Sequence, residues 1–431
     1  MAAEIHAVRG MNDVLPAEIG AWQHFESCTR ELLAAYGYEE IRVPLLEHTE
    51  LFKRAIGEHT DVVGKEMYTF TDRGGDSLTL RPEATAGIVR ALISNRMLRG
   101  QRHKLWCLGP MFRHEAPQAG RYRQFWQVDV EAVGCPGPDV DAELIALTAR
   151  LWQRLRITGL TLQLNSLGTA ECRRAYRAQL VDYLSARRDQ LDADSQRRLG
   201  SNPLRVLDSK NPAMQELIQA APRLTAHLDP ESRTHFEALC GMLNALGVPY
   251  EINPLLVRGL DYYNRTVFEW ITSFKGAQNA VCSGGRYDGL IAQLGGDDTP
   301  AVGFAMGVER LVALLSAAGG VPASARPDVY VVVSGAGAEQ QALQLVERLR
   351  DERPRLRLEL NVGGGNFKAQ FRRADKSGAA LALIIGEDEL ARGVVGMKPL
   401  RDNAGQSECA IAQLAAGLDA ALAALDSGPA P

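Results

Sequence analysis

The sequence has few of the features that mark secreted or metal-stabilised proteins. Its seven cysteines are an odd number, and no two of them have Cys-x-x-Cys spacing. This argues against a disulfide framework or a zinc site and is typical of a protein in a reducing cytosol. The eight histidines form no cluster of possible ligands either. We therefore expect a cytoplasmic location and no tightly bound metal.

Long apolar runs and an excess of positive charge are also absent. No stretch of about 18 apolar residues occurs, so we expect no membrane span. The opening residues, Met-Ala-Ala-Glu-Ile-His, lack the basic segment and apolar core of a secretory signal. Because the net charge is −4, any nucleic-acid partner must be bound by local basic patches.

The length of 431 residues, with 46% apolar and 23% charged residues, predicts a soluble globular protein of two or three domains. Over residues 1–325, short strands joined by hairpins predict an α+β domain with an antiparallel sheet. Charged helical stretches, punctuated by Asn-Pro and Asp-Pro pairs, predict a helical insertion at about 169–248. After a Gly- and Pro-containing linker at 319–327, alternating strands and helices over 326–431 predict an α/β domain with a largely parallel sheet.

Hydrophobic periodicity predicts the individual elements of the first domain. We expect helices over 21–36 and 139–155. We expect strands over 41–43, 67–70, 78–80, 105–108, 127–131, 250–253 and 266–271.

The most informative stretch is a cationic, aromatic hairpin. If Met111-Phe-Arg-His-Glu115 is a strand, Arg113 and Glu115 point to the same side. The return strand after the turn at Gly120 carries Arg121, Arg123 and Phe125. Arg113 could neutralise a phosphate, Glu115 could accept a purine amine, and Phe125 could stack on the base. A charged surface hairpin explains the same pattern.

Two distant segments fit the same kind of site. Glu83 and Thr85 follow Pro82 at the mouth of a predicted helix, where a carboxylate could cap the helix or hold a substrate ammonium. Further along, the small residues of Ala301-Val-Gly-Phe-Ala-Met-Gly307 lead into a helix that carries Arg310. The glycines permit close approach of a ligand or of another backbone. Taken alone, this segment could equally be a packed one with Arg310 on a solvated face.

Together the three segments resemble the signature motifs of class II aminoacyl-tRNA synthetases. The Phe112-Arg-His-Glu115 hairpin is similar to motif 2, and Gly307-Val-Glu-Arg310 is similar to motif 3. The helix after Trp22, with the strand Ile41-Arg-Val-Pro44, is similar to motif 1.

Two further strings narrow the resemblance to one family. Leu256-Val-Arg-Gly-Leu-Asp-Tyr-Tyr-Asn-Arg-Thr-Val-Phe-Glu269 and Ser283-Gly-Gly-Arg-Tyr-Asp-Gly289 resemble the two histidine-specific motifs of the histidyl-tRNA synthetase family. The resemblance runs from Arg9 to the C-terminal domain.

The resemblance implies a two-step ligase reaction. The histidine carboxylate would attack the α-phosphate of ATP, which arrives with Mg²⁺, to give histidyl-adenylate and pyrophosphate. The 3′ end of tRNA for histidine would then accept the histidine. The resemblance also implies a homodimer formed through the motif 1 region and a C-terminal anticodon-binding domain. The helical insertion is either a bracing subdomain or a clamp on the tRNA acceptor arm.

Phosphoryl transfer needs charge neutralisation and alignment. We expect Arg113 at the α-phosphate and Arg310 over the adenine or the outer phosphates. By resemblance, Arg258 is a second catalytic cation, although it could instead form a buried ion pair with Asp261. The residues expected to bind ATP are Arg113, Glu115, Arg121, Phe125 and Arg310.

The amino-acid pocket must recognise an imidazole, which when neutral offers one donor and one acceptor. Glu131 and Tyr263 can supply the matching acceptor and donor. The resemblance implies the remaining residues that bind histidine, namely Glu83 and Gln127 at the α-amino group, Thr85 near the adenylate and Tyr262 lining the pocket. Because neighbouring strand residues point to opposite faces, we expect Tyr263 to lie closer to the ligand than Tyr262.

For tRNA, the resemblance favours contact by a basic helix after Gly363-Gly-Gly-Asn-Phe367 over a merely solvated face. We expect tRNA contacts from Arg123, Lys368, Arg372 and Arg373. The aromatic rings of Phe367 and Phe371 share one helical face, and we expect them to pack inward.

Two departures from the family pattern, Ala84 and Trp126, remove none of these ligands. Trp126 should point away from Gln127. The rival functions are a regulatory subunit of the histidine-biosynthetic ATP phosphoribosyltransferase, an amino-acid-sensing or tRNA-binding module, and another synthetase of the class. The retained arginines and the C-terminal domain argue against the first two, and the absence of zinc ligands argues against a threonyl enzyme.

Overall fold

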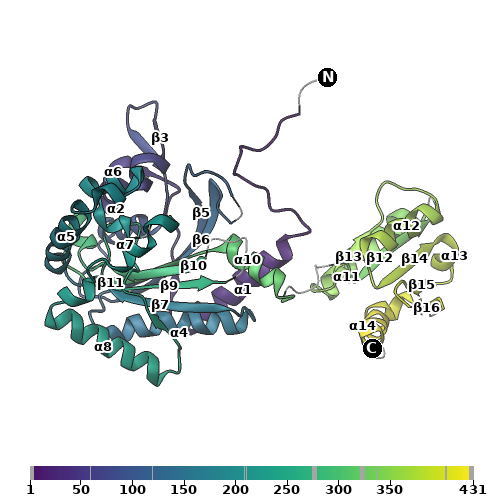
Figure 1. The fold of residues 1–431 in the computed structure, drawn as a ribbon. Helices are drawn as coiled ribbons and strands as arrows, with labels where there is room; N and C mark the ends of the chain where they lie inside the picture. Colours follow the sequence, from purple (N-terminus) through teal and green to yellow (C-terminus); the bar gives the residue numbers. More distant parts are fainter. Residues whose placement is uncertain are drawn as a thin grey trace. The chain divides into compact units, whose positions relative to one another are not determined.

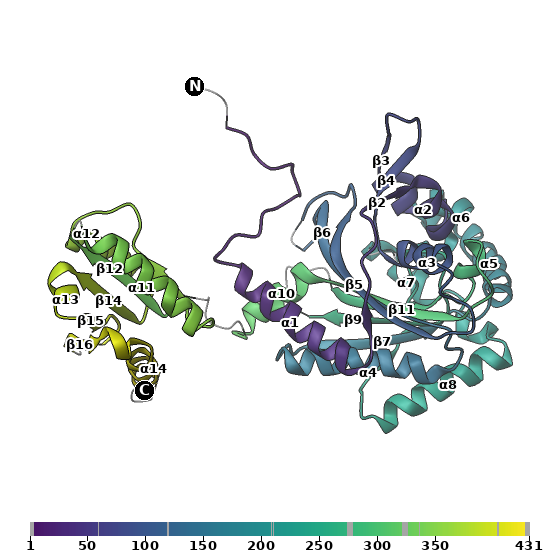
Figure 2. The same cartoon turned by 180° about the vertical axis from the view of Figure 1, so that it is seen from behind.

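The computed structural model describes residues 4–58, 60–118, 120–207, 209, 211–273, 279–320, 326–335, 337–402 and 405–426. The chain forms two compact units, Met1–Pro322 and Ala323–Pro431 (Figures 1 and 2). Of the linker expected at 319–327, residues 321–325 lie outside the described part of the chain. None of the helices within that part is both long and apolar enough to cross a bilayer.

The first unit is built on an eight-stranded sheet with the order β1-β5-β6-β11-β10-β9-β7-β8. Only the β1–β5 and β7–β8 pairs are parallel, which confirms the antiparallel sheet. The strands are β1 (Glu39–Glu40), β5 (His103–Phe112), β6 (Gln124–Val133), β7 (Leu160–Ser166), β8 (Glu251–Ile252), β9 (Asn264–Thr272), β10 (Ala280–Arg286) and β11 (Ala301–Gly307).

The strand expected at 41–43 was wrong, because β1 ends at Glu40. The amide of Ile41 still donates to the carbonyl of Trp106 at 2.8 Å. Pairing then stops just before Pro44, a residue that has no N–H to donate to a neighbouring strand.

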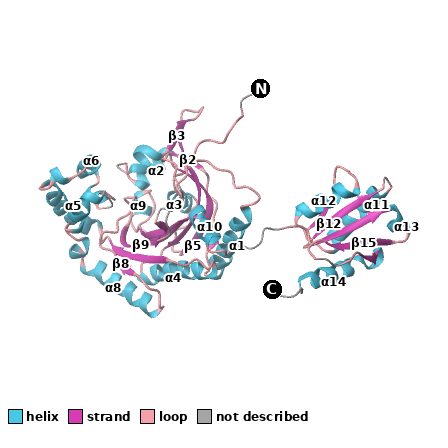
Figure 3. Cartoon of the chain, turned by 45° about the vertical axis from the view of Figure 1, so that its right-hand side comes forward, coloured by secondary structure: helices cyan, strands magenta, loops and turns pink. Residues whose placement is uncertain are grey.

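One face of the sheet packs on long amphipathic helices. Even-numbered residues of β6, such as Val128 and Val130, are buried in this core with Trp106, Phe268 and Phe304. The helices of this layer are α1 (Ile19–Ala35), α4 (Pro138–Arg154), α8 (Pro230–Ala245) and α10 (Val308–Ala317), with α4 and α8 running along the sheet in Figure 3.

The opposite face carries the odd-numbered residues of β6 and a second apolar cluster. Its elements are α2 (Thr49–Ile56), a π-helical turn (Val62–Glu66), α3 (Thr85–Ser94), α9 (Leu290–Gln293) and the small sheet of β2 (Leu46–His48), β4 (Ser77–Leu80) and β3 (Tyr68–Thr71). The helices α5 (Ala170–Ser185), α6 (Ala193–Ser201) and α7 (Gln215–Gln219) join it, with 3-10 turns at Arg188–Gln190, Pro203–Val206, Pro212–Met214 and Leu224–His227. The helices expected at 169–248 are therefore divided, because α8 packs under the other face.

The second unit holds a five-stranded sheet with the order β13-β12-β14-β15-β16. Its first three strands are parallel, whereas β15 and β16 are antiparallel additions, so the expected largely parallel sheet is a mixed one. The elements are β12 (Val329–Ser334), α11 (Ala338–Glu352), β13 (Leu358–Leu360), α12 (Phe367–Ser377), β14 (Leu381–Gly386), α13 (Glu387–Ala391), β15 (Val394–Pro399), β16 (Ser407–Ala410), a 3-10 turn (Ile411–Gln413) and α14 (Leu414–Asp426).

A fully buried ion pair ties the sheet of the first unit to its helical layer. The guanidinium of Arg286, at the end of β10, contacts Asp141 of α4 at 2.8 Å, and both side chains are 0% exposed. Arg286 also bonds Asp288 at 3.0 Å and the carbonyls of Cys135 and Gly137 at 2.9 and 2.6 Å. Because the donors of the Arg286 guanidinium all have partners, removing one partner should destabilise the fold.

We therefore predict that Asp141→Ala lowers the free energy of unfolding of the first unit by about 3–5 kcal/mol, since it leaves a buried guanidinium unpaired. Urea unfolding followed by tryptophan fluorescence reports this unit alone, because all five tryptophans, at 22, 106, 126, 152 and 270, lie in it. Glu50→Ala, which breaks the exposed pair with Arg54, is the control and should cost less than about 1 kcal/mol. Equal losses in both variants would contradict the assignment.

Candidate active site

Three polar residues share one face of β6 and form the floor of a candidate site. Gln127, Asp129 and Glu131 alternate with residues buried in the helical layer, so their side chains point to the opposite face. Across from them on β11 lie Gly307, Ala305 and Gly303 respectively. Each polar residue is therefore paired across the strands with a residue that has little or no side chain.

Gly303 is required by its close approach to Glu131. A Cβ atom at Gly303 would lie 1.6 Å from Glu131 Oε2 and 2.6 Å from the carbonyl oxygen of Val130. Neither clash can be relieved without moving the carboxylate or the sheet, so a side chain at 303 is incompatible with this floor.

The carboxylate of Glu131 is buried and bound by two hydroxyl groups. Thr85 Oγ1 donates to Oε1 at 2.6 Å, and the phenol of Tyr287 donates to Oε2. Burial raises the pKa of Glu131 to about 8, and these two hydrogen bonds oppose the rise. Thr85, at the start of α3, and Glu131 are thus brought together, and Tyr287 joins them although sequence reasoning did not single it out.

Glu83 caps the helix that begins at Thr85. Its carboxylate accepts the backbone amides of Thr85 at 2.8 Å and Ala86 at 2.9 Å. Burial raises the pKa of Glu83, and the amides counter that rise. The capping explanation is therefore correct. The same carboxylate lies near Asp129 and Glu131, and its negative charge raises the pKa of both.

The two tyrosines lie just before β9 rather than on it. Their buried rings contact each other, with centroids 4.6 Å apart, and Tyr262 meets Tyr287 at 5.6 Å. The expectation that they point to opposite faces was wrong, because neither residue has strand geometry. On the sheet below Tyr263, a Cβ at Gly285 would lie 3.0 Å from its Cδ1 atom.

Arg258 lies beside this aromatic cluster and contacts two strands. It forms an ion pair with Glu269 of β9 at 2.9 Å and donates to Ser283 Oγ of β10 at 2.8 Å. Its guanidinium is 5.6 Å from the centroid of the Tyr263 ring. The possible pairing with Asp261 was wrong, since the acid that Arg258 meets is Glu269.

The residues expected to grip ATP gather around the loop between β5 and β6. The strands end at Phe112 and resume at Gln124, so Arg113 and Glu115 are loop residues and not strand neighbours as expected. Pairing continues to Arg113, whose amide donates to the carbonyl of Arg123 at 2.9 Å, and the next amide, that of His114, donates to the carbonyl of Glu66 at 2.6 Å instead.

Within this loop the charged groups engage one another and the aromatic ring. Arg113 lies over Phe125, 5.3 Å from its centroid, and donates to the carbonyl of Pro82 at 2.8 Å. Glu115 pairs with Arg121. Arg310, on α10, donates to the carbonyl of Gly120 at 2.8 Å, and this contact brings motif 3 to motif 2.

Trp126 and Arg123, at the start of the return strand, have different surroundings. Trp126 packs edge-on against Trp22 at 6.2 Å, in the helical layer, which confirms that it points away from Gln127. Arg123 donates to the carbonyl of Glu115 at 3.2 Å, and its amide bonds Gly10 of the N-terminal arm at 2.7 Å.

Sequence reasoning missed three buried residues of this site: Asp129, Tyr287 and Arg81. Asp129 shares the strand face of Gln127 and Glu131, and this alternation was the available signal. Tyr287 stands within the second histidine-specific string. Arg81 bonds the carbonyls of Pro110 at 3.1 Å and Val43 at 3.0 Å, a role that no local pattern indicates.

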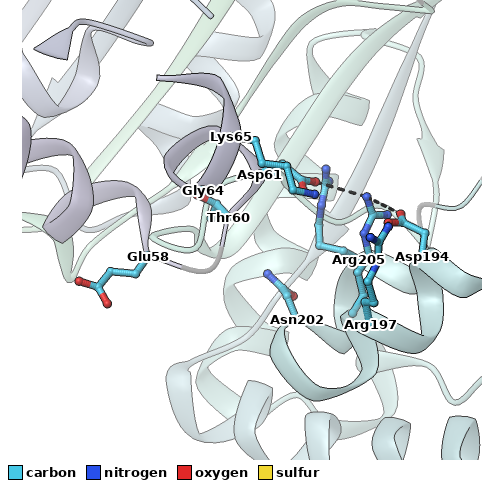
Figure 4. A pocket seen from close by; sticks show the side chains of 11 residues that line it. Glu58, Thr60, Asp61, Gly64, Lys65, Asp194, Arg197, Asn202 and Arg205 are labelled. Carbon is cyan, nitrogen blue, oxygen red and sulfur yellow. Dashed lines mark hydrogen bonds and ion pairs between the residues drawn. The ribbon is translucent and has the colours of Figure 1, made fainter. Parts of the chain in front are cut away.

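A pocket of about 350 Å³ adjoins the loop that carries Arg258. It lies between the π-helical turn and α6, and it reaches Gly259. Its charged walls pair with each other: Asp61 meets Arg198 at 3.3 Å, and Asp194 meets Arg197 at 2.7 Å. Figure 4 labels Asp61, Asp194 and Arg197 among the side chains that line it. The Asp61–Arg198 pair joins the helical insertion to the segment after α2, whereas the Asp194–Arg197 pair lies within α6.

The helical insertion also contacts the loop before β9 that carries Tyr262 and Tyr263. Arg173 of α5 donates to the carbonyls of Asp261, at 3.2 Å, and Tyr263, while Asn202 donates to Asp261 Oδ1 at 3.1 Å. These contacts support a bracing role for the insertion.

In the second unit, the basic residues of α12 differ in their surroundings. Arg373 donates to Asn361 Oδ1 at 2.6 Å and to the carbonyl of Gly364 at 2.9 Å, so it closes the glycine loop. Lys368 and Arg372 are exposed. The expectation that Phe367 packs inward was wrong, because it is 46% exposed.

Comparison with known proteins identifies the two units. The family model described as histidyl-tRNA synthetase matches residues 10–311, and the anticodon binding domain model matches residues 328–420. The crystal structure of an apo histidyl-tRNA synthetase from S. aureus matches with 34% identity and a TM-score of 0.80, over 96% of this chain and 100% of that chain.

Two further structures match in fold. One is a histidyl-tRNA synthetase from Nostoc sp. PCC 7120, with 22% identity, a TM-score of 0.67 and coverage of 97% and 100% of the two chains. The other, from Bacillus halodurans C, is titled an ATP phosphoribosyltransferase regulatory subunit/histidyl-tRNA synthetase, with 21% identity, a TM-score of 0.64 and coverage of 90% and 99%.

The raised pKa of Glu131 predicts a pH-dependent stability. The folded chain binds a proton at Glu131 that the unfolded chain has released, between the ordinary pKa of 4.5 and the folded value of about 8. Stability should therefore fall as pH rises through this window, with a slope from Glu131 of up to about 1.4 kcal/mol per pH unit. Glu131→Gln should remove this part of the slope in urea unfolding followed by tryptophan fluorescence. Glu50→Gln, at an exposed position, should leave it unchanged, and an unaltered slope in Glu131→Gln would refute the assignment.

Proposed function

Because the chain belongs to the histidyl-tRNA synthetase family, which activates histidine with ATP and transfers it to tRNA, we propose that the residues around β6 form the site of histidyl-adenylate formation. The chain combines a class II catalytic core with a C-terminal anticodon-binding domain. We assign residues 1–325 to the first and residues 326–431 to the second. The observation that carries the proposal is a buried acidic floor beside a rim of three arginines.

The arginines of the rim neutralise the triphosphate. Arg113 binds the α-phosphate, Arg258 stabilises the charge that develops there, and Arg310 packs over the adenine or holds the outer phosphates. The contact of Arg113 with the Phe125 ring supports a base-stacking place beside the phosphate cation. Glu115 and Arg121 pair with each other, and we propose that they turn to the adenine and the phosphates when ATP binds. Alignment and charge neutralisation are what phosphoryl transfer demands of a protein.

The acidic floor selects histidine. Glu131 accepts the imidazole N–H and Tyr263 donates to the other ring nitrogen, which together match the donor and acceptor of a neutral imidazole. Gln127 and Glu83 bind the α-amino group. Thr85 approaches the adenylate, and Tyr262 walls the pocket. A substrate without the two ring nitrogens would leave buried polar groups unpaired, which penalises its binding.

ATP is proposed to arrive with Mg²⁺ as a substrate complex. Within the described ranges, no group of three His, Cys, Asp or Glu side chains is placed to hold a metal. The protein's own contribution to charge neutralisation is therefore assigned to its arginines.

We also propose a cytoplasmic homodimer formed through the motif 1 region. Large apolar side chains are exposed there and on the N-terminal arm, among them Ile5, Val8, Leu15, Leu45 and Leu46. Burial of these side chains against a second copy would remove their apolar surface from water.

For tRNA, we propose contacts from Arg123 at the motif 2 loop and from Lys368 and Arg372 on α12, with Arg373 shaping the adjoining glycine loop. The exposed ring of Phe367, the residue before Lys368, supports stacking against a single-stranded base.

The test of the function is histidine-dependent exchange of pyrophosphate into ATP, with the other nineteen amino acids as controls. Exchange should occur with histidine alone. Arg258→Ala should lower the rate by about 10²–10³-fold, because a donor to the developing charge is lost, while the exposed Arg233→Ala on α8 should match the wild type. Histidine binding without exchange in the wild type would favour a regulatory paralogue, and normal exchange in Arg258→Ala would rule out its catalytic role.

The tRNA proposal predicts a separation of the two steps. Lys368→Ala combined with Arg372→Ala should raise the KM for tRNA about 10-fold and reduce the slope of log KM against log salt by about 1–2, with pyrophosphate exchange unchanged. Arg353→Ala combined with Arg392→Ala removes the same charge from exposed ion pairs in this unit and is the control. Equal effects in both double variants would show that only the total charge of this unit matters and would contradict a specific contact by Lys368 and Arg372.

A further inference from the structure

Asp129 is a buried carboxylate that the described residues leave without a hydrogen-bond partner. It is 1% exposed, and neither Oδ1 nor Oδ2 receives a donor from that part of the chain. Two residues earlier on the same face of β6, the buried Oε1 atom of Gln127 also lacks a partner there. A buried polar group without a partner costs free energy, so this pair of unfilled acceptors indicates a missing donor.

The other acids of the floor have donors already. Glu83 accepts two backbone amides and Glu131 accepts two hydroxyls. Among these three acids, Asp129 is therefore the one that receives no hydrogen bond from the described part of the chain.

The neighbouring cations do not supply the missing donor. Arg81 and Arg113 lie close enough to stabilise negative charge at Asp129, yet the hydrogen bonds of Arg81 go to the carbonyls of Pro110 and Val43, and that of Arg113 goes to the carbonyl of Pro82. Burial, reinforced by Glu131 and Glu83, raises the pKa of Asp129 well above its ordinary value. A cation brought by a ligand would stabilise the negative charge of Asp129.

The position of Asp129 places it under any ligand that spans the floor. A strand rises about 3.3 Å per residue, so Gln127 and Glu131 are about 13 Å apart with Asp129 midway. Its cross-strand neighbours are the small residues Ala305 on β11 and Cys107 on β5. Neither neighbour covers the carboxylate with a long side chain.

We propose that Asp129 binds the α-ammonium of histidine together with Gln127 Oε1, and that it is a specificity residue of this pocket. The inference rests on the proposed assignment of the pocket to histidine. The α-ammonium is the one group of the substrate that offers three donors and a positive charge at once. Asp129 thus adds a second charged acceptor to Glu83, which also holds the start of α3 through two backbone amides.

The test compares ligands that differ in the ammonium group. In the pyrophosphate-exchange assay, the KM of histidine is measured with the Ki of histidinol, which keeps the ammonium, and of 3-(imidazol-4-yl)propionate, which lacks it. Asp129→Asn should raise the first two values about 10- to 100-fold, the cost of losing a hydrogen bond to a charged group, and change the third less than about 2-fold. Asp129→Ser is a second, smaller variant, and the exposed Asp351→Asn is the control.

Equal weakening of all three ligands, or of none, would overturn the inference and leave the proposed function intact. Absence of histidine-dependent exchange in the wild type would instead overturn the proposed function. If neither variant folds, calorimetry on the wild type in buffers of different ionisation enthalpy decides. Histidinol should then release more protons on binding than 3-(imidazol-4-yl)propionate, and equal release would contradict the inference.

Discussion

The buried carboxylate of Glu131 holds three distant segments of the first unit in register. Its oxygens are bound by Thr85 at the start of α3 and by Tyr287 after β10, and its own strand is the centre of the floor. Because a buried acid without donors is costly, none of these elements can shift without losing part of this network. This network requires glycine at position 303, since any Cβ there would displace the Glu131 carboxylate. The hydrogen-bond network around Glu131 is therefore formed before any ligand binds.

The charges of the site are arranged in two zones. Acids lie on the floor, where burial raises the pKa of Glu83, Asp129 and Glu131, and the arginines lie on the loops and at the helix start above. In the proposed mechanism, this separation directs the ammonium and imidazole of histidine downward and leaves its carboxylate facing the phosphate cations. Proximity and orientation of this kind lower the barrier for attack without a covalent intermediate.

Much of this arrangement followed from the sequence, because alternation and periodicity report strands and helices directly. The antiparallel sheet and the helix at Ile19–Ala35 were foreseen in this way. The partner of Arg258 was not, since Glu269 meets it through the folding of the loop onto β9. The prediction for the rings of Tyr262 and Tyr263 was wrong because side chains alternate between two faces in a strand, and these residues lie in a loop. In the second unit, β15 was missed because Gly396 and Lys398 interrupt the apolar pattern that revealed β12 and β14. The strand β16 was missed because Ser407–Ala410 has no apolar run.

A crystal structure of the protein soaked with histidine would show whether the amino acid binds on the face of β6 that carries Gln127, Asp129 and Glu131. We expect density for the imidazole between Glu131 and Tyr263 and for the ammonium over Gln127 and Asp129, with β11 unmoved. Histidine bound away from β6, or bound only after Glu131 has left Thr85 and Tyr287, would contradict this expectation.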